Sequence, residues 1–223
     1  MDAEEVARYL QENPLFFEQY PDLLSRLTLP HPLTGQTIPL IERQVLSLRE
    51  RGKALEAKLA ELIQFGEEND AISEKMHRLV LALLAAPSLD TLIASLYYHL
   101  REDFEVPHAA LRLWAARPEI AQDRSEFAPA SDPLKQFAAS LSQPYCGPSA
   151  SPEALSSFAE AASHVRSAAF MALREPGAAG VQGACIGLLA LGSEDPLRFY
   201  PEMGTLYLKR LGEIAGAGLA RLL

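Results

Sequence analysis

The stretch that decides the fold is IERQVLSLRERGKALEAKLAELIQFGEENDAISEKMHRLVLAL, residues 41–83. Apolar residues recur along it at steps of three and four, the spacing of the a and d positions of a coiled coil. Two successive steps of three, from Leu59 to Leu62 and on to Phe65, form a stammer in this repeat. The positions of the stripe are Ile41, Val45, Leu48, Gly52, Leu55, Leu59, Leu62, Phe65, Asn69, Ile72, Met76, Leu79 and Leu83.

A single helix over this stretch is about 65 Å long at a rise of 1.5 Å per residue. A small domain is too short to cover such a stripe, so the pattern predicts a partner helix from a second copy of the chain. Asn69 stands at an a or d position, where asparagine typically fixes the register and the number of strands. The sequence therefore predicts a parallel homodimer through a coiled coil.

The composition is that of a folded, acidic protein. The chain has 223 residues, 48% of them hydrophobic, with a formal net charge of −9. This charge speaks against a nucleic-acid partner, because such binding depends on Lys and Arg neutralising phosphates. The dense basic cluster of Arg43, Arg49, Arg51 and Lys53 is interpreted as a solvated flank of the coiled coil, paired with neighbouring glutamates.

The two cysteines, Cys146 and Cys185, are too few for a disulfide framework and badly spaced for a zinc site. The acidic start of the chain does not resemble a secretory signal, and no apolar run approaches the ~20 residues that span a bilayer. We therefore expect a soluble, cytoplasmic protein with no membrane partner and no metal.

Periodicity divides the chain into three regions. Residues 1–38 are predicted to form short helices, with a capping box from Asp2 to Glu5, and Asn13 with Pro14 is predicted to end the first helix and start a second. Residues 39–84 form the long coiled-coil helix. Residues 85–223 form an α+β domain. Its helices are expected over 89–100, 133–142, 152–162 and 201–223, and its strands over 108–115, 165–173 and 184–191, while 144–148 is either a short strand or a turn.

The last region resembles a GAF domain, a small α+β sensor module. The resemblance lies in VRSAAFMAL, residues 165–173, in GACIGLLALGS, residues 183–193, and in the phrase EDPLRF with the helix that follows it. The segment from Pro176 to Gly180 is predicted to be the hairpin between the two strands. The resemblance implies a central antiparallel sheet with helices, and a small-ligand pocket between the sheet and the loops and helices on its open side.

The whole chain is similar to a narrower bacterial family, known as domain of unknown function 484. The similarity implies an architecture of amino-terminal helices, a coiled coil and a GAF-like domain, and it implies no established activity. The residues that carry it are Tyr9, Leu10, Pro14, Phe16, Phe17, Pro21, Leu23, Leu24, the segments 30–35, 42–44 and 48–49, Cys146, Gly147, Ser167, the segment 187–193, Phe199 and the segment 203–205.

A pocket of the GAF type would be lined by the region 116–164 and its flanks. Trp114 and Tyr145 suit a flat ligand because they combine apolar area with one polar group, although both are equally typical of a core. Arg112 alternates with Leu111 and Leu113 and is predicted to face solvent. The candidate ligand-binding residues are Trp114, Tyr145, Cys146, His164, Arg166 and Ser167.

The sequence does not identify a ligand or a cofactor. With no phosphate-cradling glycine loop and an acidic balance, the sequence favours a small apolar or aromatic ligand over a nucleotide. Free methionine sulfoxide reductases also use a GAF fold, and Cys146 with Gly147 lies roughly where they have a Cys-Gly pair. The second cysteine of those enzymes has no counterpart here, so the thiol lacks a resolving partner and an adjacent base.

The sequence thus predicts no catalytic residue. The function that it favours is a non-enzymatic, dimeric signalling protein, either a small-ligand sensor or an adaptor. One alternative is a scaffold whose GAF-like domain has lost its ligand and serves only contacts with a protein partner. The other is the thiol enzyme, which the missing second cysteine disfavours.

Overall fold

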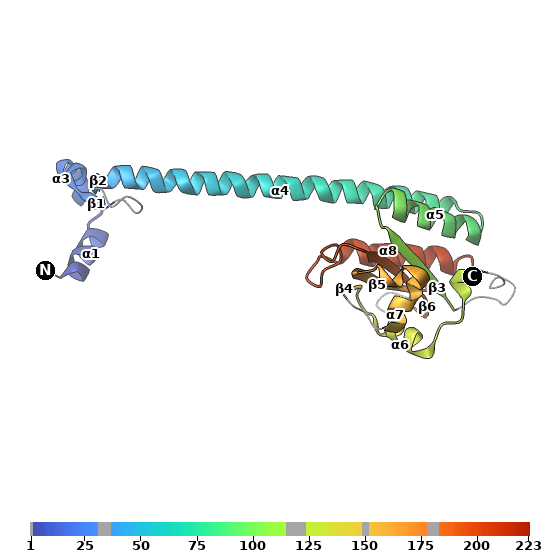
Figure 1. The fold of residues 1–223 in the computed structure, drawn as a ribbon. Coiled ribbons are helices and arrows are strands. Elements are labelled where there is room, and N and C mark those ends of the chain that lie inside the picture. Colours follow the sequence, from blue (N-terminus) through green and yellow to red (C-terminus); the bar gives the residue numbers. More distant parts are fainter. Residues whose placement is uncertain (1, 31–36, 115–123, 149–151, 178–182) are drawn as a thin grey trace. The chain divides into compact units, whose positions relative to one another are not determined.

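The computed structural model describes residues 2–30, 37–114, 124–148, 152–177 and 183–223. The chain falls into two compact units, Met1–Glu68 and Asn69–Leu223. The predicted α+β class is confirmed. Short helices and a long helix precede a four-stranded antiparallel sheet that is packed with helices (Figure 1).

The first unit starts with three short helices, α1 (Ala3–Glu12), α2 (Phe16–Gln19) and α3 (Pro21–Arg26). The predicted capping box is present, because the Asp2 side chain accepts from the start of α1 and the Asp2 N–H donates to Glu5 Oε2 at 2.9 Å. Pro21 stands in the first turn of α3, where its missing N–H has no helical partner to lose.

The prediction that Asn13 and Pro14 start the second helix is wrong. The predicted end of the first helix at Asn13 is confirmed, since its backbone N–H and its Nδ2 both donate to the Tyr9 carbonyl, at 3.0 and 2.9 Å. Helix α2 begins only at Phe16 and has no side-chain cap. Asparagine suits both ends of a helix, so the sequence allowed either assignment.

A short antiparallel hairpin that the sequence did not predict, β1 (Thr28–Pro30) and β2 (Thr37–Pro39), precedes the long helix. Helix α4 (Leu40–Ala85) then confirms the helix predicted over 39–84 to within one residue at each end. Pro39 itself is the last residue of β2 and not part of the first turn of α4.

In the second unit the end of α4 packs with α5 (Leu89–Glu102) and α8 (Leu206–Ala220). Ser88 caps α5, because its Oγ accepts from the Thr91 N–H at 3.3 Å. Met76, Leu79 and Leu83, the last positions of the predicted stripe, are buried here. The expectation that the chain's own domain leaves the whole stripe uncovered is therefore wrong for this end of α4.

The sheet has the strand order β3-β6-β5-β4, and all neighbours are antiparallel. Leu111 and Met171 both stand opposite Leu189 on the first face, while Phe170 stands opposite Ala190 on the second face. The strands are β3 (His108–Leu113), β4 (Tyr145–Gly147), β5 (Ser167–Arg174) and β6 (Cys185–Ser193).

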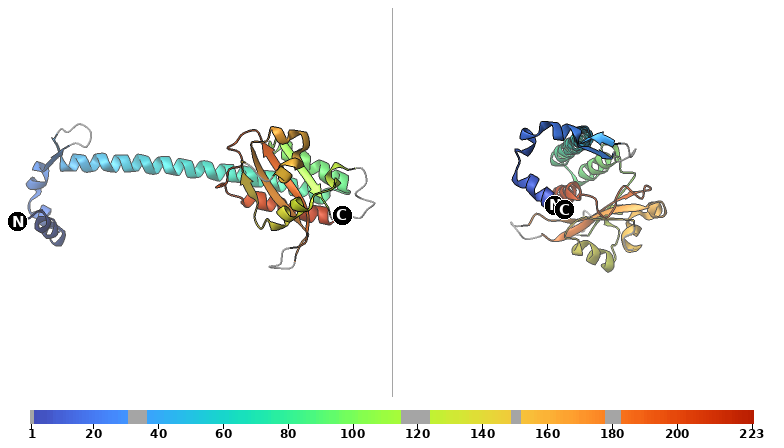
Figure 2. Two further views of the ribbon diagram at one scale, coloured as in Figure 1. Left: turned by 60° about the horizontal axis from the view of Figure 1, so that its bottom comes forward. Right: turned by 90° about the vertical axis from the view of Figure 1, so that its left-hand side faces the viewer.

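Both faces of the sheet are covered. The first face packs against α8 and α5, and the end of α4 belongs to the same core. The second face packs against α6 (Asp132–Ser140), α7 (Pro152–Leu155) and the 3₁₀ helix η2 (Ser156–Ser163), on the side opposite α8 (Figure 2). The two central strands, β5 and β6, are consequently buried along most of their length, without the alternation of a half-exposed strand.

Helix α8 approaches β5 closely because it carries glycines where the two meet. A Cβ at Gly216 would lie 2.7 Å from the Arg174 carbonyl oxygen, and one at Gly212 would lie 3.2 Å from the Met171 Cβ. The close approach offsets the weakening that glycine brings to a helix interior. The predicted terminal helix, expected from Pro201, begins only at Leu206.

Two further expectations differ from the structure or lie outside it. The helix predicted over 152–162 is broken into α7 and η2, and Ala159 within it has φ 50°. Of the predicted hairpin loop, residues 178–180 lie outside the described residues, while the strands on either side of it, β5 and β6, are confirmed as antiparallel neighbours.

The burial of the end of α4 predicts a test. Leu79 has no exposed surface, so Leu79→Ala should lower the free energy of unfolding by about 2–5 kcal/mol, measured by urea denaturation. The matched control is Leu84→Ala on the same helix, where the side chain is 67% exposed and the change should stay within about 0.5 kcal/mol. Equal effects of the two changes would contradict the packing.

Candidate functional site

Aromatic rings fill the space between the second face of the sheet and its helices. Phe170 projects from β5 and lies 5.7 Å from the ring of Phe137 and 6.1 Å from that of Phe158, centroid to centroid. Tyr145 joins them at 6.2 Å from Phe170. Trp114 packs against the same cluster and donates its Nε1–H to the Cys185 carbonyl at 2.9 Å. Both predicted pocket aromatics therefore contribute to a core.

Cys146 follows Tyr145 on β4, so its side chain turns to the first face and joins the core there. Burial raises the pKa of the Cys146 thiol to about 11. Burial also raises the pKa of Cys185, whose Sγ donates to the Gly187 carbonyl at 3.5 Å. A thiol held in its protonated form is a poor nucleophile, so the geometry gives Cys146 the role of a small core residue.

The other three predicted residues lie near the start of β5. Ser167 is buried, donates to the Asp195 carbonyl at 2.6 Å and accepts from the Phe199 N–H at 3.3 Å. It thereby anchors the turn that follows β6. His164 and Arg166 are exposed. The six predicted residues are thus spread over both faces of the sheet and the start of its central strand β5, and the structure does not bring them together around one cavity.

A hollow of about 310 Å³ lies at the edge of the sheet formed by β3, and we call it the β3-edge pocket. Polar and apolar side chains share its wall. The residues that line it are Tyr97, Pro107, His108, Ala109, Ala110, Leu111, Arg112, Ser125, Ser157, Phe158, Ala159 and Ala161. They come from α5, β3, η2 and the short 3₁₀ helix η1 (Ser125–Phe127).

Arg112 enters this pocket, and the prediction that it faces solvent is wrong. Its side chain is half-buried and donates to the Ser125 carbonyl at 2.6 Å and to the Ser157 carbonyl at 3.5 Å. The alternation along β3 was interpreted correctly, because Leu111 and Leu113 share the first face. The second face is covered by helices, however, so the opposite phase does not lead to water.

Two hydroxyl groups stand beside Arg112. The Tyr97 hydroxyl accepts from the Leu111 N–H at 3.1 Å, and burial, followed by the negative charge of Glu126, raises the pKa of Tyr97. Its own proton is therefore available to donate at neutral pH. Ser157 is only 4% exposed, and its Oγ has no hydrogen-bond partner among the described residues. A buried hydroxyl without a partner costs stability, so it needs an explanation.

A larger hollow of about 720 Å³ lies between α8, the end of β5 and the segment before β4. Arg174 lines it, but its guanidinium already donates to the carbonyls of Gly183, Ala139 and Leu141, at 3.3, 2.7 and 3.3 Å. These bonds tie β5 to nearby segments of the same chain, so the guanidinium is already engaged. The β3-edge pocket, with an unsatisfied hydroxyl in its wall, is the better candidate site.

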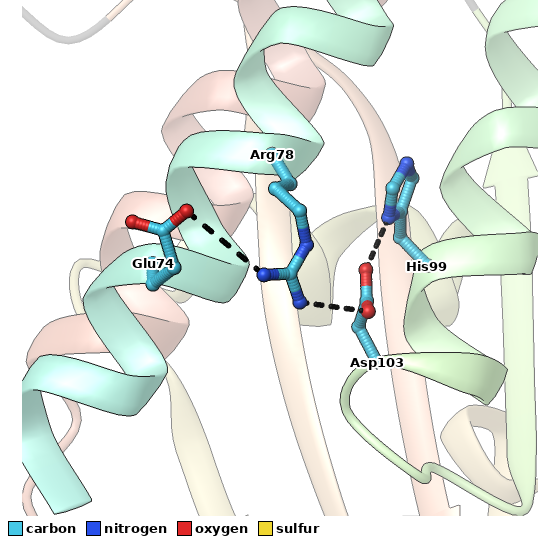
Figure 3. A network of polar contacts seen from close by, with 4 residues as sticks. All are labelled: Glu74, Arg78, His99 and Asp103. Atoms are coloured by element: carbon cyan, nitrogen blue, oxygen red, sulfur yellow. Dashed lines mark hydrogen bonds and ion pairs between the residues drawn. The ribbon is translucent and has the colours of Figure 1, made fainter.

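A separate polar network joins the end of α4 to α5 (Figure 3). Arg78 donates to Asp103 Oδ1 at 2.9 Å and lies 4.0 Å from Glu74, while His99 Nδ1 lies 2.5 Å from Asp103 Oδ2. The hydrogen bond from His99, with a further contribution from Arg78, lowers the pKa of Asp103. Its residues line neither of the two hollows, and the network holds the two helices together.

Within the described part of the chain, no three or more His, Cys, Asp or Glu side chains are grouped so that they could hold a metal ion. Among the described residues, no helix has the length and apolar character needed to cross a membrane.

Comparison with known proteins finds a family model over residues 1–222 with the description "Protein of unknown function, DUF484". A relative from Salmonella typhimurium strain LT2, described as uncharacterized protein YigA, is 28% identical over 220 residues. The match covers 95% of this chain and 88% of the relative. The sequence similarity therefore extends along almost the whole length of both proteins.

The cysteine environments predict a low thiol reactivity. Cys146 in the folded protein should resist iodoacetamide near neutral pH, because its pKa of about 11 leaves little thiolate. Mass spectrometry should show modification only after urea unfolds the domain. Rapid labelling of native Cys146 would contradict this and would restore the thiol enzyme as a candidate. Cys146→Ser serves as the control for assigning the labelled site.

Asp103 predicts a pH dependence of stability. Its pKa is lower in the folded state than in the unfolded state, so its contribution is present above the unfolded value, about 3.9, and is lost as the pH falls through the folded value. Asp103→Asn should therefore unfold more easily at neutral pH and lose less stability than wild type as the pH falls below about 4. Urea midpoints against pH measure this, with Glu102→Gln as the charge-matched control. Parallel acid curves for Asp103→Asn and wild type would contradict the assignment.

Proposed function

This chain belongs to the DUF484 family of proteins of unknown function, and we propose that it is a dimeric, non-enzymatic sensor. In this proposal the first part of α4 pairs with the same segment of a second copy as a parallel coiled coil. The carboxy-terminal domain, which we interpret as GAF-like, takes a small ligand.

The observation that carries the proposal is the exposure of the apolar stripe on the first part of α4. Leu55 is 72% exposed and Leu48 is 64% exposed, and the other apolar members from Val45 to Phe65 are exposed as well. A soluble chain rarely leaves such a continuous apolar surface in water. The spacing of the stripe suits pairing with a second copy of the same helix. Each a or d side chain would then pack among four side chains of the facing helix.

The apolar stripe also changes its direction around the helix axis before it passes from exposed to buried residues. A stammer is equivalent to an insertion of three residues, which falls about 60° short of a full turn of the helix. The stammer from Leu59 to Phe65 thus turns the apolar seam before it reaches Met76 and Leu79, which the chain's own domain covers. The two parts of α4 are therefore suited to two different neighbours, a second copy and the carboxy-terminal core.

The amino-terminal helices support the same proposal. Tyr9, Phe16 and Tyr20 form a small ring cluster, with Phe16 lying 6.0 Å from Tyr9 and 5.1 Å from Tyr20. None of the residues of α1 and α2 is buried. Such apolar helices gain stability when a second copy of the chain covers them.

The sensor role of the carboxy-terminal domain is supported by its antiparallel sheet with helices and by the β3-edge pocket, where Ser157 lacks a partner among the described residues. The two cysteines are free and their thiols are held protonated, which favours a binding protein over a thiol enzyme and suits a reducing compartment such as the cytoplasm. A ligand-free adaptor remains the second candidate, because Phe137, Phe158 and Phe170 fill the rest of the second face.

The coiled coil predicts an oligomeric state that a double substitution reverses. Wild type should sediment as a dimer, while Leu55→Glu with Leu59→Glu should sediment as a monomer, because two charges per helix would enter the seam. The control is Ala57→Glu with Ala60→Glu, which adds the same charges at exposed positions outside the a and d stripe.

Analytical ultracentrifugation at tens of micromolar distinguishes the outcomes, and circular dichroism shows whether the carboxy-terminal domain stays folded. A monomeric wild type, or a double variant that still dimerises, would overturn the proposed dimer.

A further inference from the structure

We infer that the β3-edge pocket binds a small organic molecule with one carboxylate and an apolar body. The inference rests on the proposed sensor function and gives it a ligand class. It follows from three features of the pocket wall, namely the half-buried guanidinium of Arg112, the hydroxyl groups of Tyr97 and Ser157, and a short apolar surface.

Arg112 supplies the cation. Its bonds to the Ser125 and Ser157 carbonyls fix the guanidinium in place, and among the described residues they engage two of its five N–H groups. The longer of the two, at 3.5 Å to Ser157, is weak. A positioned, half-buried guanidinium with unused donors matches the planar, two-oxygen geometry of a carboxylate.

Ser157 and Tyr97 supply further donors. The Ser157 Oγ is buried in the pocket wall without a partner among the described residues, so a bound carboxylate oxygen would satisfy it. The Tyr97 hydroxyl accepts from Leu111 and keeps its own proton for a second acceptor. Burial of these hydroxyls makes them selective, because a ligand without an acceptor leaves them unpaired.

The backbone of the same wall is strained. Ala159 lines the pocket with φ 50°, in a region that side chains other than glycine rarely adopt. The kink breaks η2 directly after Ser157 and Phe158, which line the pocket together with Arg112. Strain of this kind is found where a fold has to place particular groups at a binding site.

The surrounding charges set the charge of the ligand. Two carboxylates act on lining residues: together with burial, the charge of Glu126 raises the pKa of Tyr97, and Glu194 lies 3.8 Å from His108 Nε2. The Arg112 guanidinium matches a single negative charge on the ligand, and a second one meets repulsion from these carboxylates. A phosphate monoester or a dicarboxylate is therefore disfavoured relative to a monocarboxylate.

The remaining wall determines the body of the ligand. Pro107, Phe158 and Ala161 give it an apolar lining, and the volume of about 310 Å³ admits a molecule of roughly ten to fifteen heavy atoms. An aryl or short acyl carboxylate fills this space, while a nucleotide exceeds it.

The test uses the full chain and three probes of one shape, phenylacetate, phenylacetamide and phenyl phosphate, in calorimetric or ligand-observed NMR titrations. We expect phenylacetate to bind at millimolar concentrations or below. The neutral amide and the phosphate should each bind at least about tenfold more weakly.

Two variants locate the site. Arg112→Gln and Ser157→Ala should each weaken phenylacetate by about tenfold or more, and Ser157→Ala should not lower the melting temperature, because it removes an unpaired buried hydroxyl. The control is Arg101→Gln, which removes an exposed arginine of α5. If Arg112→Gln fails to fold, Ser157→Ala and the probe series still decide.

Absence of phenylacetate binding at tens of millimolar, equal binding of the acid and its amide, tighter binding of the phosphate, or unchanged binding by Ser157→Ala would each overturn the inference. The dimer measured by ultracentrifugation does not depend on these titrations. If phenylacetate does not bind but the protein is a dimer, the ligand class is wrong and the coiled-coil assembly stands. If the protein is a monomer that binds phenylacetate, the assembly is wrong and the ligand class stands.

Discussion

The burial of the end of α4 is the packing on which the rest of the structure depends. Leu79 and Leu83 belong to the same core as Leu92 and Leu96 of α5 and Leu189 of the sheet. The end of the helix that bears the exposed stripe is thereby part of the domain core. The stammer fits this arrangement, since it rotates the apolar seam by about 60° between its exposed residues and those that the core buries.

The second constraint is that the sheet is covered on both faces. A domain of this size gains most of its stability by burying both sides of its central strands, so each polar group placed there must find a partner. Arg112 and Trp114 meet this requirement through main-chain carbonyls. Ser157 does not meet it within the described part of the chain, which makes it the group that most clearly indicates a missing partner.

The sequence predicted the elements well because their signals are local. The heptad stripe, the strands around Phe170 and Leu189 and the capping box at Asp2 each depend on residues close together in the chain. The sequence did not predict the break at Ala159, where a non-glycine residue takes a conformation that composition does not reveal. The end of the stripe was assigned to a partner because periodicity shows that a face is apolar and does not show what covers it.

The candidate site could not be predicted without knowing what covers each face of the sheet. Alternation along β3 placed Arg112 opposite Leu111 correctly, and the error was to equate that second face with solvent. Helices were predicted over 133–142 and 152–162, and a sheet with only the first face covered would have left them without an apolar surface to pack on. That mismatch is the signal that could have placed Arg112 in a pocket. No such signal pointed to Tyr97 or Ser157, because both are distant from Arg112 in the sequence and come close to it only in the folded domain.

The positions of Tyr97 and α5 give the pocket a direct physical connection to α4. Tyr97 lines the β3-edge pocket, and the helix that carries it is held to α4 by the ion pair of Arg78 with Asp103 at 2.9 Å and by the shared leucine core. A ligand shifts a conformational equilibrium only by its differential affinity for two arrangements. Because the pocket wall and the neighbour of α4 are the same helix, a ligand that favours one packing of α5 acts on α4 through a single layer of side chains. A ligand bound in this pocket would therefore reach the end of α4 through α5.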